Sequence, residues 1–347
     1  MSEELLVNIQ NEKLSFFTPA GEVKALNDVN ITLRPGEVLG IVGESGSGKS
    51  VTAYSLMGLT AHPGKLIGGS VEFNGHAIHE MGEKDIRKIR GNEVSIIFQD
   101  PMTSLNPVYT IGNQITEVIT LHTGKNKQEA KARARELLEL VGINEPDKRL
   151  KQYPHELSGG MRQRIMIAIA LACEPKLLIA DEPTTALDVT IQAQILELMM
   201  DLKEKLGMAI IMITHDLGVV ASMCDRIAVM YAGRIVEYGS TDQIFYEPKH
   251  MYTKGLIRSI PRLDAKEHTR LIPIEGTPVD MLNPPAGCPF GPRCEACMKI
   301  CLRENPPVTR FGDIHYTCCW LQQKEQMEAA AHQNLKAASQ PVQEGEF

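Results

Sequence analysis

The sequence predicts an α/β fold built on a parallel sheet, followed by a small module rich in cysteine and proline. Short apolar runs that resemble buried strands alternate with longer helix-like stretches, as expected for parallel strands covered on both faces. One of these strands runs directly into a glycine-rich loop. After residue 260 the composition changes, and prolines break up any longer element.

Each element can be assigned from its local pattern. Buried strands are expected at 38–42, 94–98, 177–180 and 209–214, and helices at 49–59, 128–141, 161–172 and 191–206. Residues 23–33 indicate antiparallel strands near the start of the chain. The pair 227–231 and 234–238, separated by Ala232 and Gly233, predicts a β-hairpin. A terminal helix is expected over 321–338, followed by a disordered tail.

Composition narrows the class of protein. The 347 residues are 43% hydrophobic and 23% charged, which is typical of a soluble globular protein with two domains. The longest apolar run, 165–173, is too short to span a bilayer, and the N-terminus lacks the basic start of a signal peptide. We therefore expect a cytoplasmic protein that reaches a membrane only through partners. The net charge of −7 argues against a nucleic-acid partner.

The glycine-rich loop is a phosphate-binding P-loop. It has the required context, because an apolar strand precedes it and a helix follows. Its amides and the helix N-terminus favour phosphate oxygens, Lys49 is expected on the β- and γ-phosphates, and Ser50 is expected to ligate Mg²⁺. The expected nucleotide-binding residues here are Gly43, Glu44, Ser45, Gly46, Ser47, Gly48, Lys49, Ser50 and Val51.

Acidic and polar residues at other strand ends complete a hydrolytic set. Asp181 ends an apolar strand and is expected beside the metal, while Glu182 follows it and is expected to orient and deprotonate the attacking water. His215 ends the next strand, where an imidazole can bridge the γ-phosphate and that water. Gln99 offers an amide oxygen to Mg²⁺ or to one of its waters.

A second anion-binding helix start lies at Ser158-Gly159-Gly160. Serine is a preferred N-cap, and the helix that follows turns its amides toward an anion. Since the P-loop already holds this chain's own phosphates, we expect these residues to close over nucleotide held by a partner chain. A plain helix cap is the alternative.

Taken together, these motifs resemble the ATP-binding subunits of ABC transporters over residues 1–260. The P-loop matches the Walker A motif, and residues 177–182 match the Walker B motif. Residues 157–161 match the signature motif, with Met161 in place of the usual glutamine. Gln99, 186–188 and His215 match the Q-loop, D-loop and H-switch. The resemblance implies a P-loop NTPase (ABC ATPase) core with an antiparallel β subdomain and a helical subdomain at about 100–172. It also implies that Phe16 stacks on adenine, although Phe17 is a rival.

Three segments resemble one subfamily in particular. Residues 98–107, residues 180–190 and the C-terminal extension are similar to the ATPases of oligopeptide and dipeptide importers. This resemblance implies an ATP-hydrolysing motor at the cytoplasmic face of the plasma (inner) membrane. The implied partners are two permease subunits, a second ATPase subunit that is often a paralogue, and an extracytoplasmic peptide-binding protein. The coupling helices of the permeases would meet residues 99–112. Importers of dipeptides, nickel or another small solute remain alternatives, as do a soluble ABC ATPase and an iron–sulfur redox enzyme.

The eight cysteines divide into two groups. Cys173 and Cys224 stand alone in apolar stretches and are expected to be buried structural thiols, whereas six cluster between 288 and 319. In a cytosolic protein such a cluster indicates metal before disulfides. The importer resemblance implies a [4Fe–4S] cluster, while the Cys-x-x-Cys pair Cys294 and Cys297 leaves zinc open, and free thiols or a disulfide are a third alternative. The implied cluster ligands are Cys288, Cys294, Cys301 and Cys319, with Cys297 and Cys318 extra.

These observations predict three parts. Residues 1–260 form the nucleotide-binding domain, 261–325 the cysteine-rich module and 326–347 the tail.

Overall fold

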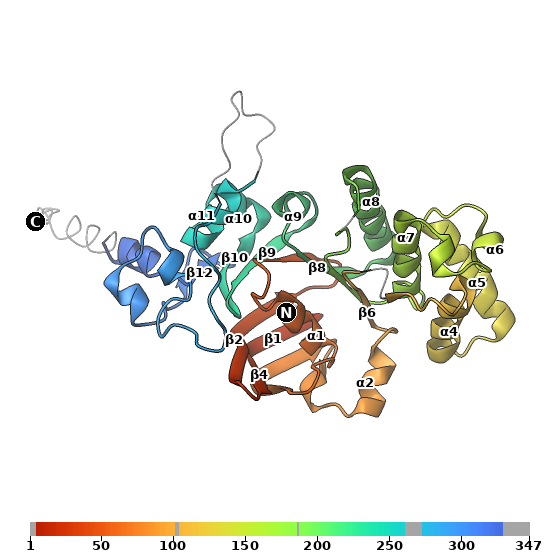
Figure 1. Ribbon diagram of the computed structural model, residues 1–347, viewed down its shortest axis with the longest axis horizontal. Coiled ribbons are helices and arrows are strands. Elements are labelled where there is room, and N and C mark those ends of the chain that lie inside the picture. The colour runs from red at the N-terminus through yellow and green to blue at the C-terminus, as the bar shows by residue number, and fades with distance from the viewer. Residues whose placement is uncertain (1–4, 101–103, 186, 261–272, 329–347) are drawn as a thin grey trace, which may run out of the picture. The chain divides into compact units, whose positions relative to one another are not determined.

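A computed structural model describes residues 5–100, 104–185, 187–260 and 273–328 (Figure 1). The chain divides into two compact units, Met1–Arg234 and Ile235–Phe347. Among the described helices, none combines the length and the apolar character needed to cross a membrane.

The core of the first unit is a parallel sheet. Its strands are β3 (Val38–Val42), β6 (Val94–Ile97), β7 (Leu177–Asp181), β8 (Ala209–Thr214) and β9 (Arg226–Tyr231), in the order β9-β3-β8-β7-β6. Every neighbouring pair is parallel. Every residue of β3, β7, β8 and β9 is buried, which explains their almost unbroken apolar sequences. The four strands expected from apolar runs are confirmed.

Helices connect these strands. They are α1 (Lys49–Leu56), α7 (Gly159–Ala170), α8 (Val189–Leu206) and α9 (Leu217–Met223). The first ends earlier than predicted, because Gly58 has a φ of 60° and the Arg90 guanidinium donates to the carbonyl oxygens of Met57 and Gly58 at 2.6 Å. Asp188 caps α8, and its Oδ1 accepts from the amide of Ile191 at 2.9 Å.

An antiparallel sheet forms the second layer of this unit. It contains β1 (Val7–Thr18), β2 (Gly21–Leu33), β4 (Gly64–Phe73) and β5 (His76–Ala77), in the order β2-β1-β4-β5. The short helices η1 (Ile78–Glu80) and α2 (Glu83–Ile89) follow. The N-terminal antiparallel strands are therefore confirmed, whereas β4 was not predicted.

A helical region inserts between β6 and β7 (Figure 1). It contains α4 (Ile111–Thr123), α5 (Lys127–Leu140), α6 (Pro146–Arg149) and η2 (Pro154–Glu156), and it leads into α7. Asn126 and Glu129 form a capping box at the start of α5. Such caps typically stabilise a helix by about 1 kcal/mol.

The second unit has little regular structure. Its elements are β10 (Arg234–Ser240), α10 (Thr241–Tyr246), α11 (Met251–Arg258), η3 (Gly291–Arg293), η4 (Lys299–Leu302), β11 (Thr309–Arg310), β12 (Tyr316–Thr317) and a helix over 320–328. β12 pairs antiparallel with β10 and with β11. The expected terminal helix is present in its described part, and the rest lies outside the described residues.

Glu237 joins separate segments of this unit. Its carboxylate is fully buried and accepts hydrogen bonds from the amides of Lys249 and His250, at 2.7 and 2.8 Å, and from His315 Nε2 at 2.9 Å. Burial lowers the pKa of His250 to about 4, so that imidazole is neutral at physiological pH. The network therefore links β10 to the segment at 249–250 and to His315.

Candidate functional site

The expected nucleotide-binding residues gather in one loop and helix start between β3 and α1. They are Gly43, Glu44, Ser45, Gly46, Ser47, Gly48, Lys49, Ser50 and Val51. Gly43 has a φ of 155°, and a Cβ there would lie 2.2 Å from the carbonyl oxygen of Met230. Gly48 has a φ of 105°, and its Cβ would lie 3.0 Å from the carbonyl oxygen of Ala25. Both positions therefore require glycine.

The turn after β9 holds the same loop through its backbone. The amide of Gly233 donates to the carbonyl oxygen of Ser47 at 2.8 Å, and the amide of Asn27 donates to the carbonyl oxygen of Gly233 at 2.8 Å. The loop is thus fixed between β9 and β2 by main-chain contacts.

Two buried polar groups in this loop fit a phosphate ligand. Lys49 is 6% exposed, and its ammonium donates to the carbonyl oxygens of Gly43 and Glu44 at 2.7 and 2.9 Å. Burial lowers the pKa of Lys49, and the nearby carboxylates of Glu182 and Asp181 oppose that shift. Ser47 Oγ is also buried, and it has no hydrogen-bond partner among the described residues. A buried hydroxyl and an ammonium held only by carbonyls are suited to an anion.

The carboxylate of Asp181 lies beside the P-loop, next to Ser50. It is 3% exposed, and its Oδ1 accepts from Ser50 Oγ at 3.1 Å while its Oδ2 accepts from the hydroxyl of Tyr54 at 3.2 Å. Burial raises the pKa of Asp181, and the two hydroxyls oppose the shift. Hydroxyl and carboxylate oxygens are the ligands that Mg²⁺ takes in phosphate sites, so the donor set fits this ion.

Glu182 contacts two other predicted site residues, Gln99 and His215. Its Oε2 accepts from Gln99 Nε2 at 2.9 Å, and its Oε1 lies 3.2 Å from His215 Nδ1. Thr185 Oγ1 also donates to Oε2, at 3.0 Å. The backbone of Glu182 has a φ of 49°, a strained conformation that occurs at functional sites. The structure thus brings Gln99 and His215 to the Glu182 carboxylate, with the amide nitrogen of Gln99 bonded to Glu182.

Sequence reasoning missed Tyr54 and Thr185. Tyr54 follows Ser50 by one helical turn, so helical spacing was the available signal. Thr185 lies three residues after Glu182, and its side chain returns to the carboxylate only because the chain turns there, with the amide of Thr185 donating to the carbonyl oxygen of Glu182 at 3.2 Å.

Ser158, Gly159 and Gly160 form the start of α7. Ser158 Oγ accepts from the amide of Met161 at 3.4 Å, so it caps the helix as predicted. Ser158 and Gly159 are exposed. Among the described residues, no hydrogen bond joins Ser158 to the P-loop, Asp181 or Glu182. Ala186 of the expected D-loop lies outside the described residues.

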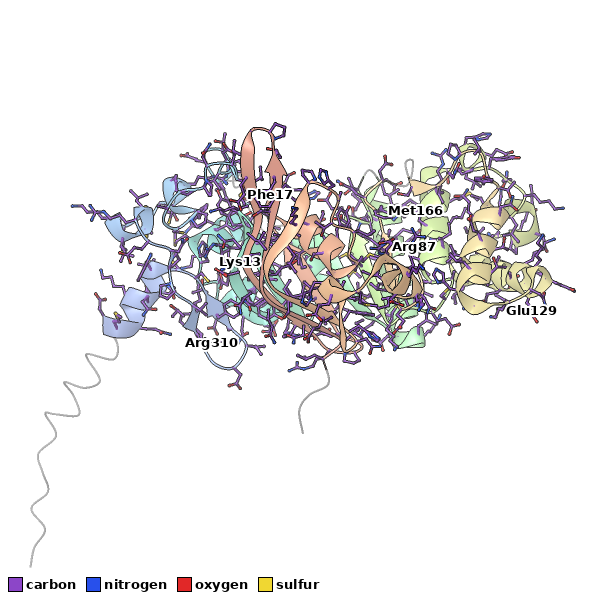
Figure 2. All side chains as sticks on the ribbon, turned by 90° about the horizontal axis from the view of Figure 1, so that it is seen from below. Lys13, Phe17, Arg87, Glu129, Met166 and Arg310 are labelled. Atoms are coloured by element: carbon purple, nitrogen blue, oxygen red, sulfur yellow. The ribbon has the colours of Figure 1, made fainter. Side chains whose placement is uncertain are left out.

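The two candidate aromatic residues lie on opposite faces of β1. Phe16 is half-buried and packs over Gly64, where a Cβ would come within 2.8 Å of its Cε1 atom. Phe17 is 46% exposed, and the Lys65 ammonium lies 5.9 Å from its ring centroid (Figure 2). Leu14, on the same face as Phe16, lines a cavity together with Ser55 of α1, so Phe16 is on the face of β1 nearer that helix.

The cysteine module contains a small cavity of about 20 Å³. The four cysteines implied as cluster ligands line it, namely Cys288, Cys294, Cys301 and Cys319. Burial raises the pKa of Cys288 to about 12 and that of Cys294 to about 11, and backbone amides that donate to the sulfurs oppose both shifts. The amide of Met298 donates to Cys301 Sγ at 3.4 Å. In the described part of the chain, no three metal-ligating side chains are already spaced to hold an ion.

The other cysteines lie elsewhere. Cys297 is exposed, Cys318 is partly exposed, and neither lines the cavity. Cys224 is buried, and burial raises its pKa to about 12, as expected for a structural thiol. Cys173 is only partly buried, and its Sγ lies 3.9 Å from the carbonyl oxygen of Val118.

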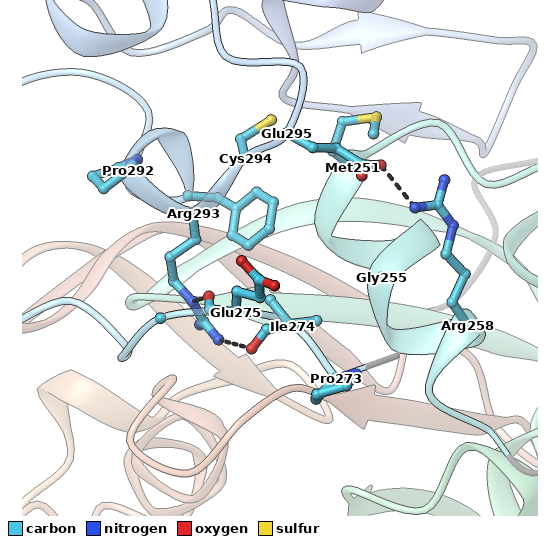
Figure 3. Close-up of a pocket in the computed structure, with 12 residues that line it drawn as sticks. Met251, Gly255, Arg258, Pro273, Ile274, Glu275, Pro292, Arg293, Cys294 and Glu295 are labelled. Carbon is cyan, nitrogen blue, oxygen red and sulfur yellow. Dashed lines mark hydrogen bonds and ion pairs between the residues drawn. The ribbon is translucent and has the colours of Figure 1, made fainter. Parts of the chain in front are cut away.

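A larger pocket of about 550 Å³ adjoins the cysteine cavity and shares Met251, Phe290 and Cys294 with it (Figure 3). Arg293 donates from Nε to the carbonyl oxygen of Glu275 at 2.9 Å and from Nη2 to that of Ile274 at 3.2 Å. These bonds tie the segment 274–276 to the turn that carries Cys294.

Comparisons with known proteins relate both parts of the chain to transporters. A family described as "ABC transporter" matches residues 26–185, and one described as "Oligopeptide/dipeptide transporter, C-terminal region" matches residues 236–301. The chain is 53% identical to the oligopeptide transport ATP-binding protein OppD of Salmonella typhimurium, over 91% of this chain and 93% of that protein. It is 50% identical to the dipeptide transport ATP-binding protein DppD of Bacillus subtilis, over 96% of this chain and 99% of that protein.

A solved structure resembles the fold. It is the dimeric ATP-binding cassette MJ0796 in a post-hydrolysis state with ADP and phosphate, which matches with a TM-score of 0.61 and 28% identity and covers 68% of this chain and 98% of that one.

Proposed function

Because the chain belongs to the ABC transporter family of ATP-binding subunits, among the oligopeptide and dipeptide transport proteins, we propose that it is the ATP-hydrolysing motor of an oligopeptide importer. The observation that carries this proposal is the contact of Glu182 with Gln99 and His215, beside the Ser50–Asp181 pair. These groups converge at the carboxyl ends of parallel strands, where α/β sheets bind ligands.

We propose that each of these residues has one task in hydrolysis. The P-loop amides and Lys49 bind the phosphates, and Ser50 and Asp181, with Gln99, would hold Mg²⁺, which neutralises charge on the phosphate oxygens when bound. Glu182 accepts a proton from the attacking water, and the His215 imidazole orients that water. Glu182 makes hydrogen bonds to three side chains, so the attacking water would use the acceptor site that remains on the carboxylate or displace one of these partners.

The exposed start of α7 supports a composite site. Ser158, Gly159 and Gly160 would bind the phosphates of ATP held by a second ATPase subunit, since helix N-termini favour anions and the P-loop serves the chain's own nucleotide. A paralogue is the proposed second subunit. ATP would close the pair, and hydrolysis would reopen it, which would drive alternating access in two permease subunits supplied by an extracytoplasmic peptide-binding protein. The chain itself would be peripheral, on the cytoplasmic face of the plasma (inner) membrane. Phe16 is the residue we assign to adenine.

A groove in the helical region is the proposed permease contact. It has a volume of about 860 Å³ and is lined by residues of α4, α5 and α6 and by Tyr109 and Thr110 from the segment expected to meet the coupling helices. Val108 and Tyr109 are 72% and 52% exposed, so both side chains are accessible to a partner.

We also propose that Cys288, Cys294, Cys301 and Cys319 hold a [4Fe–4S] cluster. Four thiols around one cavity, with backbone amides donating to sulfur, are the donor set of such clusters. Zinc held through Cys297 is less favoured, because Cys297 lies away from the cavity. The cluster would cross-link segments that share little apolar core.

Reconstitution with the permeases and binding protein in vesicles tests the function. We expect ATP hydrolysis that oligopeptides stimulate and that drives their uptake. Stimulation by dipeptides or nickel alone would assign the alternative substrates, and a chain that hydrolyses ATP without associating with permeases would contradict the importer role.

A further inference from the structure

We propose that Tyr54 is a positioning residue that orients the Asp181 carboxylate for Mg²⁺, an inference that rests on the proposed ATPase function. Tyr54 does not touch nucleotide in this scheme; it acts through Asp181.

The geometry of α1 carries the proposal. Ser50 and Tyr54 are one helical turn apart, so both side chains face the end of β7. Ser50 Oγ donates to Oδ1 of Asp181 at 3.1 Å, and the Tyr54 hydroxyl donates to Oδ2 at 3.2 Å. One helix therefore holds both oxygens of a carboxylate that is 3% exposed.

The second hydrogen bond restricts a rotation that the first leaves free. The terminal torsion of aspartate joins sp³ and sp² carbons and has a broad energy profile, so a carboxylate held through one oxygen can turn about that bond. A donor on each oxygen defines the plane of the carboxylate. Because metal ligation depends on the direction of the oxygen lone pairs, that plane decides how well Asp181 meets the ion or its water.

The ring of Tyr54 is anchored independently of its hydroxyl. Its centroid lies 6.5 Å from that of Phe98, with an interplanar angle of 52°, and Phe98 directly precedes Gln99. Replacing Tyr54 with phenylalanine keeps this packing and removes only the donor to Asp181. If Tyr54 serves packing alone, phenylalanine should be an equal substitute.

A measurement of metal binding distinguishes the positioning role of the Tyr54 hydroxyl from a role of its ring in packing alone. In the full-length E182Q chain, which is expected to retain nucleotide, we would measure ATP affinity in EDTA and then titrate the ATP-loaded protein with Mn²⁺, detecting bound ion by electron paramagnetic resonance. For Tyr54→Phe we expect unchanged ATP affinity in EDTA and about 3- to 10-fold weaker Mn²⁺ binding, which corresponds to the loss of one ordinary hydrogen bond.

Two further variants control the experiment. Tyr246→Phe removes a hydroxyl from a side chain that is 83% exposed in α10, and it should bind Mn²⁺ like the parent. Tyr54→Ala removes ring and hydroxyl together and should lose metal affinity at least as strongly as Tyr54→Phe. Unchanged Mn²⁺ binding in Tyr54→Phe, or an equal loss of ATP affinity in EDTA, would overturn the positioning role. Failure of the parent chain to bind ATP would instead refute the proposed function.

Discussion

Glu182 Oε1 and His215 Nδ1 lie 3.2 Å apart at the ends of the neighbouring parallel strands β7 and β8. The register of the two strands pairs Asp181 with Ile213, and the amide of Glu182 donates to the carbonyl oxygen of Ile213 at 2.8 Å. The strand pairing therefore sets the distance between the proposed base and the proposed orienting imidazole.

Replacing Glu182 with glutamine should leave ATP binding intact and lower the turnover number by about 10²- to 10⁴-fold, because the amide cannot accept the proton of the attacking water. Nucleotide binding and phosphate release in the assembled importer are the measurements. Glu197→Gln, an exposed carboxylate in α8, is the matched control and should keep wild-type turnover. Wild-type turnover in Glu182→Gln would rule out the base.

Replacing Ser158 with alanine should lower ATP hydrolysis by the assembled importer without weakening ATP binding to this chain's own P-loop. The reason is that the helix cap would act on nucleotide held by the partner. Binding of a fluorescent ATP analogue to the isolated chain, compared with hydrolysis by the complex, checks this. Lys49→Ala should show the opposite pattern and lose binding in the isolated chain. A loss of binding in both variants would contradict the composite site.

Stability should depend on pH through Glu12. Burial raises the pKa of this fully buried carboxyl from its ordinary value of 4.5 to about 7, so the folded protein favours the protonated form. The protonated Glu12 carboxyl therefore contributes fully to the free energy of unfolding below about pH 4.5. This contribution is lost as the pH rises through about 7. Glu12→Gln should remove this loss and gain up to about 3 kcal/mol over the wild type at pH 8. Urea unfolding at pH 5 and pH 8 measures the difference, and identical slopes with pH in both proteins would contradict it.

Single serine substitutions should divide the cysteines into two classes. Substitution of a cavity cysteine should remove iron and acid-labile sulfide, whereas Cys297→Ser and Cys318→Ser should keep them, because those thiols lie away from the cavity. The assay is metal and sulfide content with an absorption spectrum on anaerobically purified protein. One zinc without sulfide in the wild type would contradict the cluster.

The sequence predicted the parts of the fold whose signal is local. β3, β7 and β8 are largely apolar runs. The P-loop follows β3 directly, Asp181 is the last residue of β7 and Glu182 comes next. β4 was missed because Gly64, Gly68 and Gly69 resemble a turn, and only pairing with β1 makes that segment a strand.

The contacts of side chains from distant segments were not predictable in the same way. The bond between Tyr54 and Asp181 exists because packing brings α1 to the end of β7, and no spacing in the sequence encodes that approach. Cys319 faces the same cavity as Cys288 for a similar reason. Motif chemistry thus suggested the groups that we propose to react, but not the residues that contact them from other segments.

The main-chain contacts at Gly43 and Gly48 bear on how loss-of-import mutations would be interpreted. Any side chain at either position meets the carbonyl oxygen of Met230 or of Ala25. A genetic selection will therefore recover alleles at these codons that misfold the loop, and their phenotype will report steric exclusion instead of phosphate contacts. Alleles at Lys49 would instead report the loss of phosphate contacts, since that side chain can be shortened without moving the backbone.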